Sequence, residues 1–330
     1  MHKGFYKGFI AVFTGLAIVV AAAATASAQT EVIFAISAKP GSLQYETATE
    51  FTRLANDRLT GKAVVKFFGA SQLGKDKDLL QKLKLGSVHI ALPSSIMSSI
   101  ADEFGLFDMP FIVKDREHVK QIDEKIFWQM IAPAAEAKGY KVLALWENGI
   151  RQITNNVRPI DTPADLDGIK LRTPKGKWRV RMFKEWGGNP TPMAFSEVFV
   201  ALQTKVIDGQ ENPLTNIYAA KFQEVQKYLS MTGHVYSPAY PTVGLKPWNE
   251  LPGDVRAILE QTAKDVQPWM YQKGAEGDRD LRTKLEAAGM KVNNADRAAF
   301  VTASRPVYEA FAAEVPGGQD LIDAALKLAK

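Results

Sequence analysis

The stretch "AVVKFFGASQLGKDKDLLQKLKLGSVHIALP", residues 63–93, carries the pattern that decides the fold. It opens with a short apolar run, continues with leucines at helical spacing up to Gly86, and closes with a second apolar run. Short runs rich in β-branched and aromatic residues are typical of strands, whereas apolar residues three and four apart indicate a helix. The stretch therefore predicts a strand, a helix that ends at Gly86, and a second strand.

Other segments extend this alternation along the chain. Strand character is found in "EVIFAIS" (31–37), "YKVLALW" (140–146) and "IKLRT" (169–173), and Thr162 with Pro163 is a typical start of a short helix. Strands that alternate with helices predict an α/β fold, in which ligands bind at the carboxyl ends of the strands.

Three further segments have helical patterns. Residues 189–213, "NPTPMAFSEVFVALQTKVIDGQENP", have an amphipathic centre between polar ends bracketed by proline. We interpret the centre as a helix that positions pocket residues at its two ends. Residues 216–229 and 252–289 are long helical patterns, and the second is long enough to bridge two lobes.

The length of the chain predicts two lobes. About 300 residues remain once an export signal is removed, which is near the size at which a single hydrophobic core stops growing. No glycine-rich linker divides the chain into halves, so we expect it to cross several times between two lobes that close at a hinge. The predicted lobes are residues 29–150 with 238–277, and residues 151–237 with 278–330.

The first 28 residues match a secretory signal peptide. Lys3 and Lys7 give a positive start, residues 8–24 form an uncharged apolar run, and "ASA" at 26–28 is a small-residue cleavage motif. We expect cleavage near Ala28 and export to the periplasm; a retained membrane anchor is the alternative, which the absence of stop-transfer charges disfavours. The sequence contains no cysteine, which excludes disulfides, thiol nucleophiles and cysteine-ligated metals.

Composition and spacing argue against several functions. The formal net charge of +5 falls to +3 without the two signal lysines, and the remaining basic residues are interspersed with acids, unlike those of a nucleic-acid binder. His89, His118 and His234 do not share the spacing of metal ligands, and we expect neither a metal nor a cofactor. Ser94 lies in "LPSSI", which lacks the Gly-x-Ser-x-Gly motif of hydrolases.

A secreted glycoside hydrolase that uses Asp208 and Glu211 is an alternative from another class. We interpret "DGQENP" (208–213) as a turn that leads into the next helix at Pro213. Two carboxylates on one turn do not face each other across a substrate, so the spacing disfavours this alternative. We interpret the amide of Asn212 as the contribution of this segment to a pocket.

Two arginines are the strongest candidates for ligand binding. Arg151 and Arg172 each follow an apolar strand and precede a polar turn. At those positions of an open α/β sheet both guanidinium groups face the ligand crevice, where they can bind a carboxylate with two hydrogen bonds. Phe195 and Trp178 are candidate pocket aromatics, although core packing is the ordinary role of such residues.

On these residues the sequence resembles the periplasmic solute-binding proteins of tripartite ATP-independent periplasmic (TRAP) transporters, of the dicarboxylate- and sialate-binding type. Three motifs carry the resemblance: "SQLGKDKDLLQKLKLGSV", "GIRQITNNVRPIDTPADLDGIKLRTP" and "GGNPTPMAFSEVFVALQTKVIDGQENPLTNIYAAKFQEVQKYLSMTGH". They follow one another in the family's order from Ser71 to His234.

The resemblance implies two α/β lobes joined by a hinge and crossed by a long helix. It implies that Arg172 pairs with the ligand carboxylate and that Arg151, Asn212 and Phe195 also belong to the pocket. The expected protein is a periplasmic receptor without enzymatic activity, which delivers a small organic carboxylate to integral-membrane subunits. Sugar acids or aromatic acids are the alternative ligands.

This chain also departs from the family's pattern. Ser37 and Ser94 stand where sialate-binding relatives have an asparagine and a glutamate, which argues against sialic acid. "KGKW" follows the arginine motif in place of small residues, so we expect Lys175 or Trp178 to shape the far end of the pocket.

Overall fold

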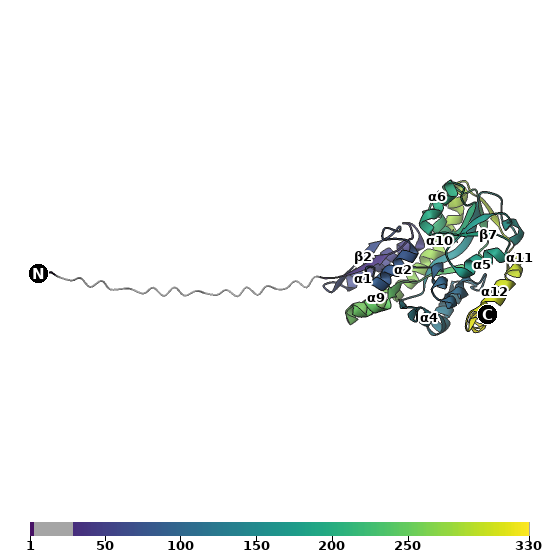
Figure 1. Ribbon diagram of the computed structural model, residues 1–330. Helices are drawn as coiled ribbons and strands as arrows, with labels where there is room; N and C mark the ends of the chain where they lie inside the picture. The colour runs from purple at the N-terminus through teal and green to yellow at the C-terminus, as the bar shows by residue number, and fades with distance from the viewer. Residues whose placement is uncertain (3–28, 330) are drawn as a thin grey trace.

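The computed structural model describes residues 1–2 and 29–329 of the chain. Two mixed β-sheets, each with helices packed around it, form its body (Figure 1). The predicted α/β class is thereby confirmed. The predicted signal peptide, residues 1–28, lies outside the described residues except for its first two positions.

The first sheet has the strand order β2-β1-β3-β11-β4. Its strands are β1 (Thr30–Ala35), β2 (Ala63–Phe68), β3 (Ile90–Ala91), β4 (Tyr140–Val142) and β11 (Thr242–Gly244). β1 pairs in parallel with β2 and β3, and β11 pairs antiparallel with β3 and β4. The predicted strand, helix and strand of residues 63–93 are confirmed as β2, α2 and β3. Gly86 ends the helix at φ +73°, a conformation that glycine adopts without steric cost.

The second sheet has the strand order β12-β9-β5-β8-β6-β7, and β10 pairs with β5 off this path. Its strands are β5 (Trp146–Asn155), β6 (Lys170–Thr173), β7 (Asn189–Pro192), β8 (Gly209–Pro213), β9 (Tyr228–Met231), β10 (Tyr236–Ala239) and β12 (Lys291–Asn294). β8 lies between β5 and β6, antiparallel to the first and parallel to the second. The ligand candidates of the sequence analysis are concentrated on these three central strands.

Two predictions about this sheet were wrong. Arg151 lies inside the long strand β5 rather than after a strand, and residues 209–213 form a buried strand rather than a turn. The register pairs Arg151 with Pro213 and Gln152 with Asn212. Pairing between segments about sixty residues apart overrides the local turn preference of Asp, Gly, Asn and Pro, because strand formation depends on neighbours in space.

Helices pack around the two sheets. They are α1 (Leu43–Arg58), α2 (Asp76–Leu85), α3 (Arg116–Ile122), α4 (Ala132–Glu136), α5 (Lys177–Glu185), α6 (Val198–Gln203), α7 (Leu214–Ala219), α8 (Leu245–Glu250), α9 (Gly253–Asp265), α10 (Gln267–Ala287), α11 (Arg297–Ala303), α12 (Arg305–Glu314) and α13 (Gly318–Leu328). In Figure 1, α1, α2 and α9 lie beside β2 on one side of the molecule, and α5, α6 and α11 lie on the other.

The long helical pattern of residues 252–289 is divided into α9 and α10. Pro268 stands one residue into α10, and proline lacks the N–H that would continue the hydrogen bonds of α9. α10 packs against α1 beside the first sheet and against α7 beside the second. The long helix that joins both halves of the fold is therefore confirmed, as a bent pair. The lobe boundaries remain a prediction.

The other two helical patterns are shorter than predicted. Residues 216–229 contain the end of α7, a 3-10 turn at Phe222–Glu224 and the start of β9. Lys221 has φ +58°, a left-handed conformation that prevents α7 from continuing toward residue 229. Residues 189–213 comprise β7, a 3-10 turn at Phe195–Glu197, α6 and β8. The helix predicted to position pocket residues is therefore short and lies between two strands.

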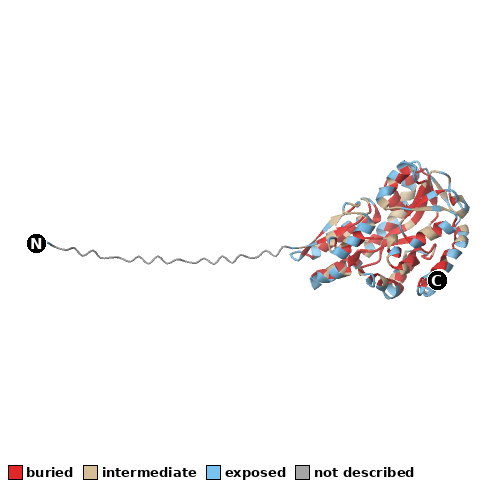
Figure 2. Ribbon diagram, in the orientation of Figure 1, coloured by how far each residue is buried: buried red, intermediate tan, exposed pale blue. Residues whose placement is uncertain are grey.

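The buried residues run through both sheets and the layers between sheets and helices (Figure 2). One cluster packs α1 and α9 onto the first sheet, and another packs α6 and α7 against Leu229 of β9 and Leu285 of α10. A third and larger cluster contains apolar side chains from α2, α5 and α12. Among the described residues no helix is long and apolar enough to cross a membrane.

Candidate functional site

A cavity with a volume of about 290 Å³ is lined by residues from both sheets. Some of these residues, such as Ser37 and Ser94, come from segments that follow β1 and β3 of the first sheet, and others come from β5, β6, β8 and α7. The principal polar side chains of the lining are Ser37, Gln44, Lys75, Asp76, Ser94, Ser95, Asn148, Arg151, Arg172, Lys175, Asn212 and Asn216. Phe195 and Met193 are among its apolar residues. Chain segments distant in sequence thus form one polar pocket.

Arg172 presents a buried positive charge to this cavity. Its side chain comes from β6 and is 3% exposed. Nε and Nη2 donate to the carbonyl oxygen of Met193, at 2.9 and 2.6 Å, which fixes the plane of the guanidinium group. Among residues 1–2 and 29–329, no carboxylate forms an ion pair with it, and three of its five N–H groups have no acceptor. Arg172 is therefore an oriented cation without a counter-ion.

The charge of Arg172 is retained at neutral pH. Burial lowers the pKa of its guanidinium to about 9, and the negative charge of Glu211 counteracts part of this effect. Since a buried charge is costly without a partner, an anion that enters the cavity gains from neutralising Arg172.

Arg151 has a different role, because its charge is already neutralised. Its Nε and Nη2 form two hydrogen bonds to the Glu211 carboxylate, and Nη2 also donates to the Glu211 carbonyl at 2.6 Å. A further bond joins Nη2 to Oδ1 of Asn212 at 3.2 Å. Arg151 lines the cavity, but these contacts make it a group that positions its neighbours rather than a second free cation.

A buried charge network lies behind the arginine wall. Glu211 also accepts from Arg179 Nη1 at 2.9 Å and contacts His234 Nε2 at 3.1 Å, while Arg179 Nη2 donates to Asp108 Oδ1 at 2.7 Å. Burial would raise the pKa of Glu211, but the charges of Arg151 and Arg179 outweigh it and hold that pKa well below its usual range. Sequence reasoning missed this network because its members are far apart along the chain and no motif joins them.

The two predicted serines line the cavity, and both hydroxyl groups bind to other parts of the protein. Ser37 Oγ donates to Asp76 Oδ1 at 2.6 Å, and Ser94 Oγ donates to the carbonyl oxygen of Pro238 at 2.6 Å. Burial raises the pKa of Asp76, whereas the bond from Ser37 and the charge of Arg172 oppose that rise. The serines therefore offer lone pairs, not protons, to the cavity.

Asn212 and Phe195 also line the cavity, as predicted from the sequence. Asn212 extends from β8, where its Nδ2 donates to Gln210 Oε1 at 2.5 Å. Phe195 stands at the start of the 3-10 turn before α6, and its ring packs against Phe222 at a centroid distance of 6.0 Å. The structure thus brings both side chains to the cavity that Arg172 lines.

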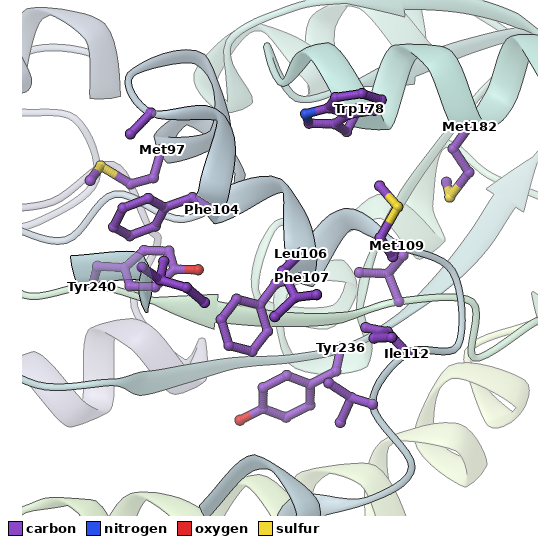
Figure 3. Packing of buried hydrophobic residues seen from close by; sticks show 14 of the residues in the cluster. Met97, Phe104, Leu106, Phe107, Met109, Ile112, Trp178, Met182, Tyr236 and Tyr240 are labelled. Atoms are coloured by element: carbon purple, nitrogen blue, oxygen red, sulfur yellow. The ribbon is translucent and has the colours of Figure 1, made fainter. Parts of the chain in front are cut away.

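Trp178 does not line the cavity, contrary to the prediction. It lies on α5, is 0% exposed, and belongs to the large apolar cluster, where Figure 3 shows it among other buried side chains. Its ring packs against that of Phe311 at a centroid distance of 5.0 Å. A Cβ added to Gly105 would lie 2.2 Å from this ring, which shows how closely the indole is enclosed. The turn of α5 directs Trp178 into the core, while Lys175, before the helix, lines the cavity.

The geometry also contradicts the hydrolase alternative. Glu211 is fully buried among its cationic partners, and Asp208 Oδ2 accepts from the backbone N–H of Lys170 at 2.9 Å. Neither carboxylate lines the cavity. The pair therefore cannot act across a substrate as an acid and a base.

Two sheets, a long helix that packs against both halves and a pocket that contains an arginine without a carboxylate partner among the described residues are the features of a ligand-binding protein. Residues 34–314 match the bacterial extracellular solute-binding proteins of family 7, and the chain belongs to this family. Its members are periplasmic solute-binding proteins of TRAP transporters and are receptors rather than enzymes. The predicted family, receptor class and periplasmic location are thereby confirmed.

Known relatives show the range of this family. The chain is 35% identical to the 2,3-diketo-L-gulonate-binding periplasmic protein YiaO of Escherichia coli K12, over 85% of this chain and 87% of that protein. Its structure is similar to that of the sugar acid binding protein DctPAm from Advenella mimigardefordensis in complex with galactonate, with TM-score 0.87 and 31% identity over 91% and 98% of the two chains. It is also similar to a TRAP solute-binding protein from Sulfurospirillum deleyianum with bound succinate, with TM-score 0.86 and 30% identity over 91% and 99%.

Proposed function

We propose that this receptor captures a small organic carboxylate through Arg172 and delivers it to the integral-membrane subunits of a TRAP transporter. The observation that carries the proposal is the buried guanidinium group of Arg172, which lacks a carboxylate partner among the described residues. Its planar group can donate two parallel hydrogen bonds to a carboxylate. The ligands named for the three relatives above are organic acids, which supports an acid as the ligand here.

The mature receptor would begin after Ala28. Residues 1–28 have the charge, apolar run and cleavage motif of an export signal. Their removal would place a protein with a formal net charge of +3 in the periplasm, where it meets anionic solutes before they reach the inner membrane.

Pairs of ligands that differ only in charge test the proposal. The mature protein is heated with galactonate, succinate and benzoate, and with the neutral amide of each acid. A ligand that binds only the native state at a hundred times its dissociation constant adds about 2.7 kcal/mol to the free energy of unfolding. We expect at least one acid to raise the melting temperature and its amide to leave the melting temperature unchanged. Equal shifts with an acid and its amide would contradict recognition of a carboxylate.

A further inference from the structure

An ion pair joins the two halves of the fold at the solvent edge of the cavity. Lys75, at the start of α2 beside the first sheet, lines the cavity with a side chain that is 47% exposed. Its Nζ donates to Glu197 Oε1 at 2.6 Å. Glu197 belongs to the 3-10 turn between β7 of the second sheet and α6, and its neighbours Ala194 and Phe195 line the cavity. The pair therefore spans the two halves where the cavity meets solvent.

The Glu197 carboxylate is oriented by its own turn. Its Oε2 accepts the backbone N–H of Ala194 at 3.2 Å, which leaves Oε1 for the lysine. The hydrogen bond from Lys75 and the charge of that lysine lower the pKa of Glu197, so the carboxylate is ionised at neutral pH. An acceptor that is already oriented loses less side-chain freedom when the pair forms, which favours the pair over one between two free side chains.

Two further contacts join the same halves near the cavity. Lys39 follows β1, and its Nζ lies 5.8 Å from the ring centroid of Phe199 on α6. Ser99, in the 3-10 helix that follows β3, donates from Oγ to the carbonyl oxygen of Lys175, beyond β6, at 2.5 Å. Separation of the two halves breaks these contacts as well as the ion pair. Of the three, only the ion pair joins two opposite full charges.

We propose that the Lys75–Glu197 pair is a latch, which slows the release of a bound acid by stabilising the closed cavity. The proposal rests on the proposed function, since the acid enters and leaves through this cavity. Because the two partners come from different halves, the pair exists only while the halves are together. Exposed ion pairs are weak, so removal of the latch should speed release by about two- to fivefold.

A double-mutant cycle tests the latch in the mature protein. Wild type, Glu197→Gln, Lys75→Gln and the double variant are loaded with radiolabelled galactonate or succinate, and release is followed after excess unlabelled acid is added. Glu197→Gln should speed release about two- to fivefold in the wild-type background and leave it unchanged in the Lys75→Gln background. The cycle cancels any direct contact of Lys75 with the acid. Equal acceleration in both backgrounds, or none in either, would overturn the latch.

Salt provides a check that a merely structural effect of the substitution would not pass. About 1 M salt screens exposed charges, so the release rate of Glu197→Gln divided by that of wild type should fall toward one. A ratio that is the same in low and high salt would show that the substitution acts without the ion pair, and would also overturn the latch.

A measurement without an acid separates the latch from the proposed function. The chain contains no cysteine, so spin labels can be attached at Thr49→Cys on α1 and Gln203→Cys on α6, both exposed. In the ligand-free protein, Glu197→Gln should increase the share of long distances between the labels, and identical distance distributions would contradict the latch. If no acid binds, the proposed function fails while a shift still supports the latch. If acids bind and Glu197→Gln leaves their release unchanged, only the latch fails.

Discussion

Replacing Glu211 with glutamine should destabilise the fold strongly. The carboxylate is 0% exposed and pairs with two buried guanidinium groups, those of Arg151 and Arg179, besides its contact with His234. Glutamine keeps the volume but removes the charge, so Arg151 loses its counter-ion and Arg179 keeps only Asp108. Removing one partner of a buried ion pair costs about 3–5 kcal/mol, because the other charge stays buried and unpaired.

Urea unfolding of the ligand-free mature protein measures this loss directly. We expect Glu211→Gln to lower the midpoint with little change in the slope, since the surface exposed on unfolding is the same. Glu197→Gln is a matched control, because Glu197 pairs with Lys75 at the surface and should change the unfolding free energy little. A loss below about 1 kcal/mol for Glu211→Gln, within the range of exposed pairs, would refute a buried charge network behind the cavity.

Three further predictions concern pH, packing and motion. Burial lowers the pKa of His234 to about 4 from 6.5, so between these pH values the unfolded chain binds a proton that the folded chain does not. The unfolding free energy should therefore fall as the pH falls from 6.5 to 4, by up to about 1.4 kcal/mol per pH unit. Urea unfolding at several pH values measures this dependence, which His234→Gln should weaken. Trp178→Ala should lower the unfolding free energy by about 3–5 kcal/mol in the same assay, because it leaves a cavity in the core. The ligand affinity measured by calorimetry should not change, and a large loss of affinity would show that Trp178 contributes to the pocket. A bound ligand should make the protein more compact in small-angle scattering, and superimposable curves with and without ligand would contradict closure about a hinge.

The local part of the fold could be predicted from the sequence. The strand, helix and strand of residues 63–93 have the apolar spacing of their elements, and Gly86 ends the helix for a backbone reason that is visible in one residue. Residues 209–213 could not be predicted in this way. Their turn-forming residues are held in a strand by β5 and β6 on either side, and this pairing is not encoded nearby.

The candidate site shows the same division. The position of Arg172 near the end of a sheet strand was sufficient to place it at the ligand crevice. The difference between Arg172 and Arg151 could not be predicted, because it depends on Glu211, sixty residues from Arg151. The direction of Trp178 depends on the rotation of α5 against the core, which a short cationic helix does not reveal.

The most direct test of the central claim is the affinity of an Arg172→Met protein for the acid that stabilises the wild-type protein most. Methionine keeps much of the apolar stem and removes the charge, and Lys175→Met at the same cavity is the matched control. Loss of one partner of a buried charge pair costs about 3–5 kcal/mol, and each 1.4 kcal/mol is tenfold, so titration calorimetry should show at least about a hundredfold weaker binding for Arg172→Met and a much smaller change for Lys175→Met. Affinity within threefold of wild type for Arg172→Met would contradict capture of the ligand carboxylate by this arginine.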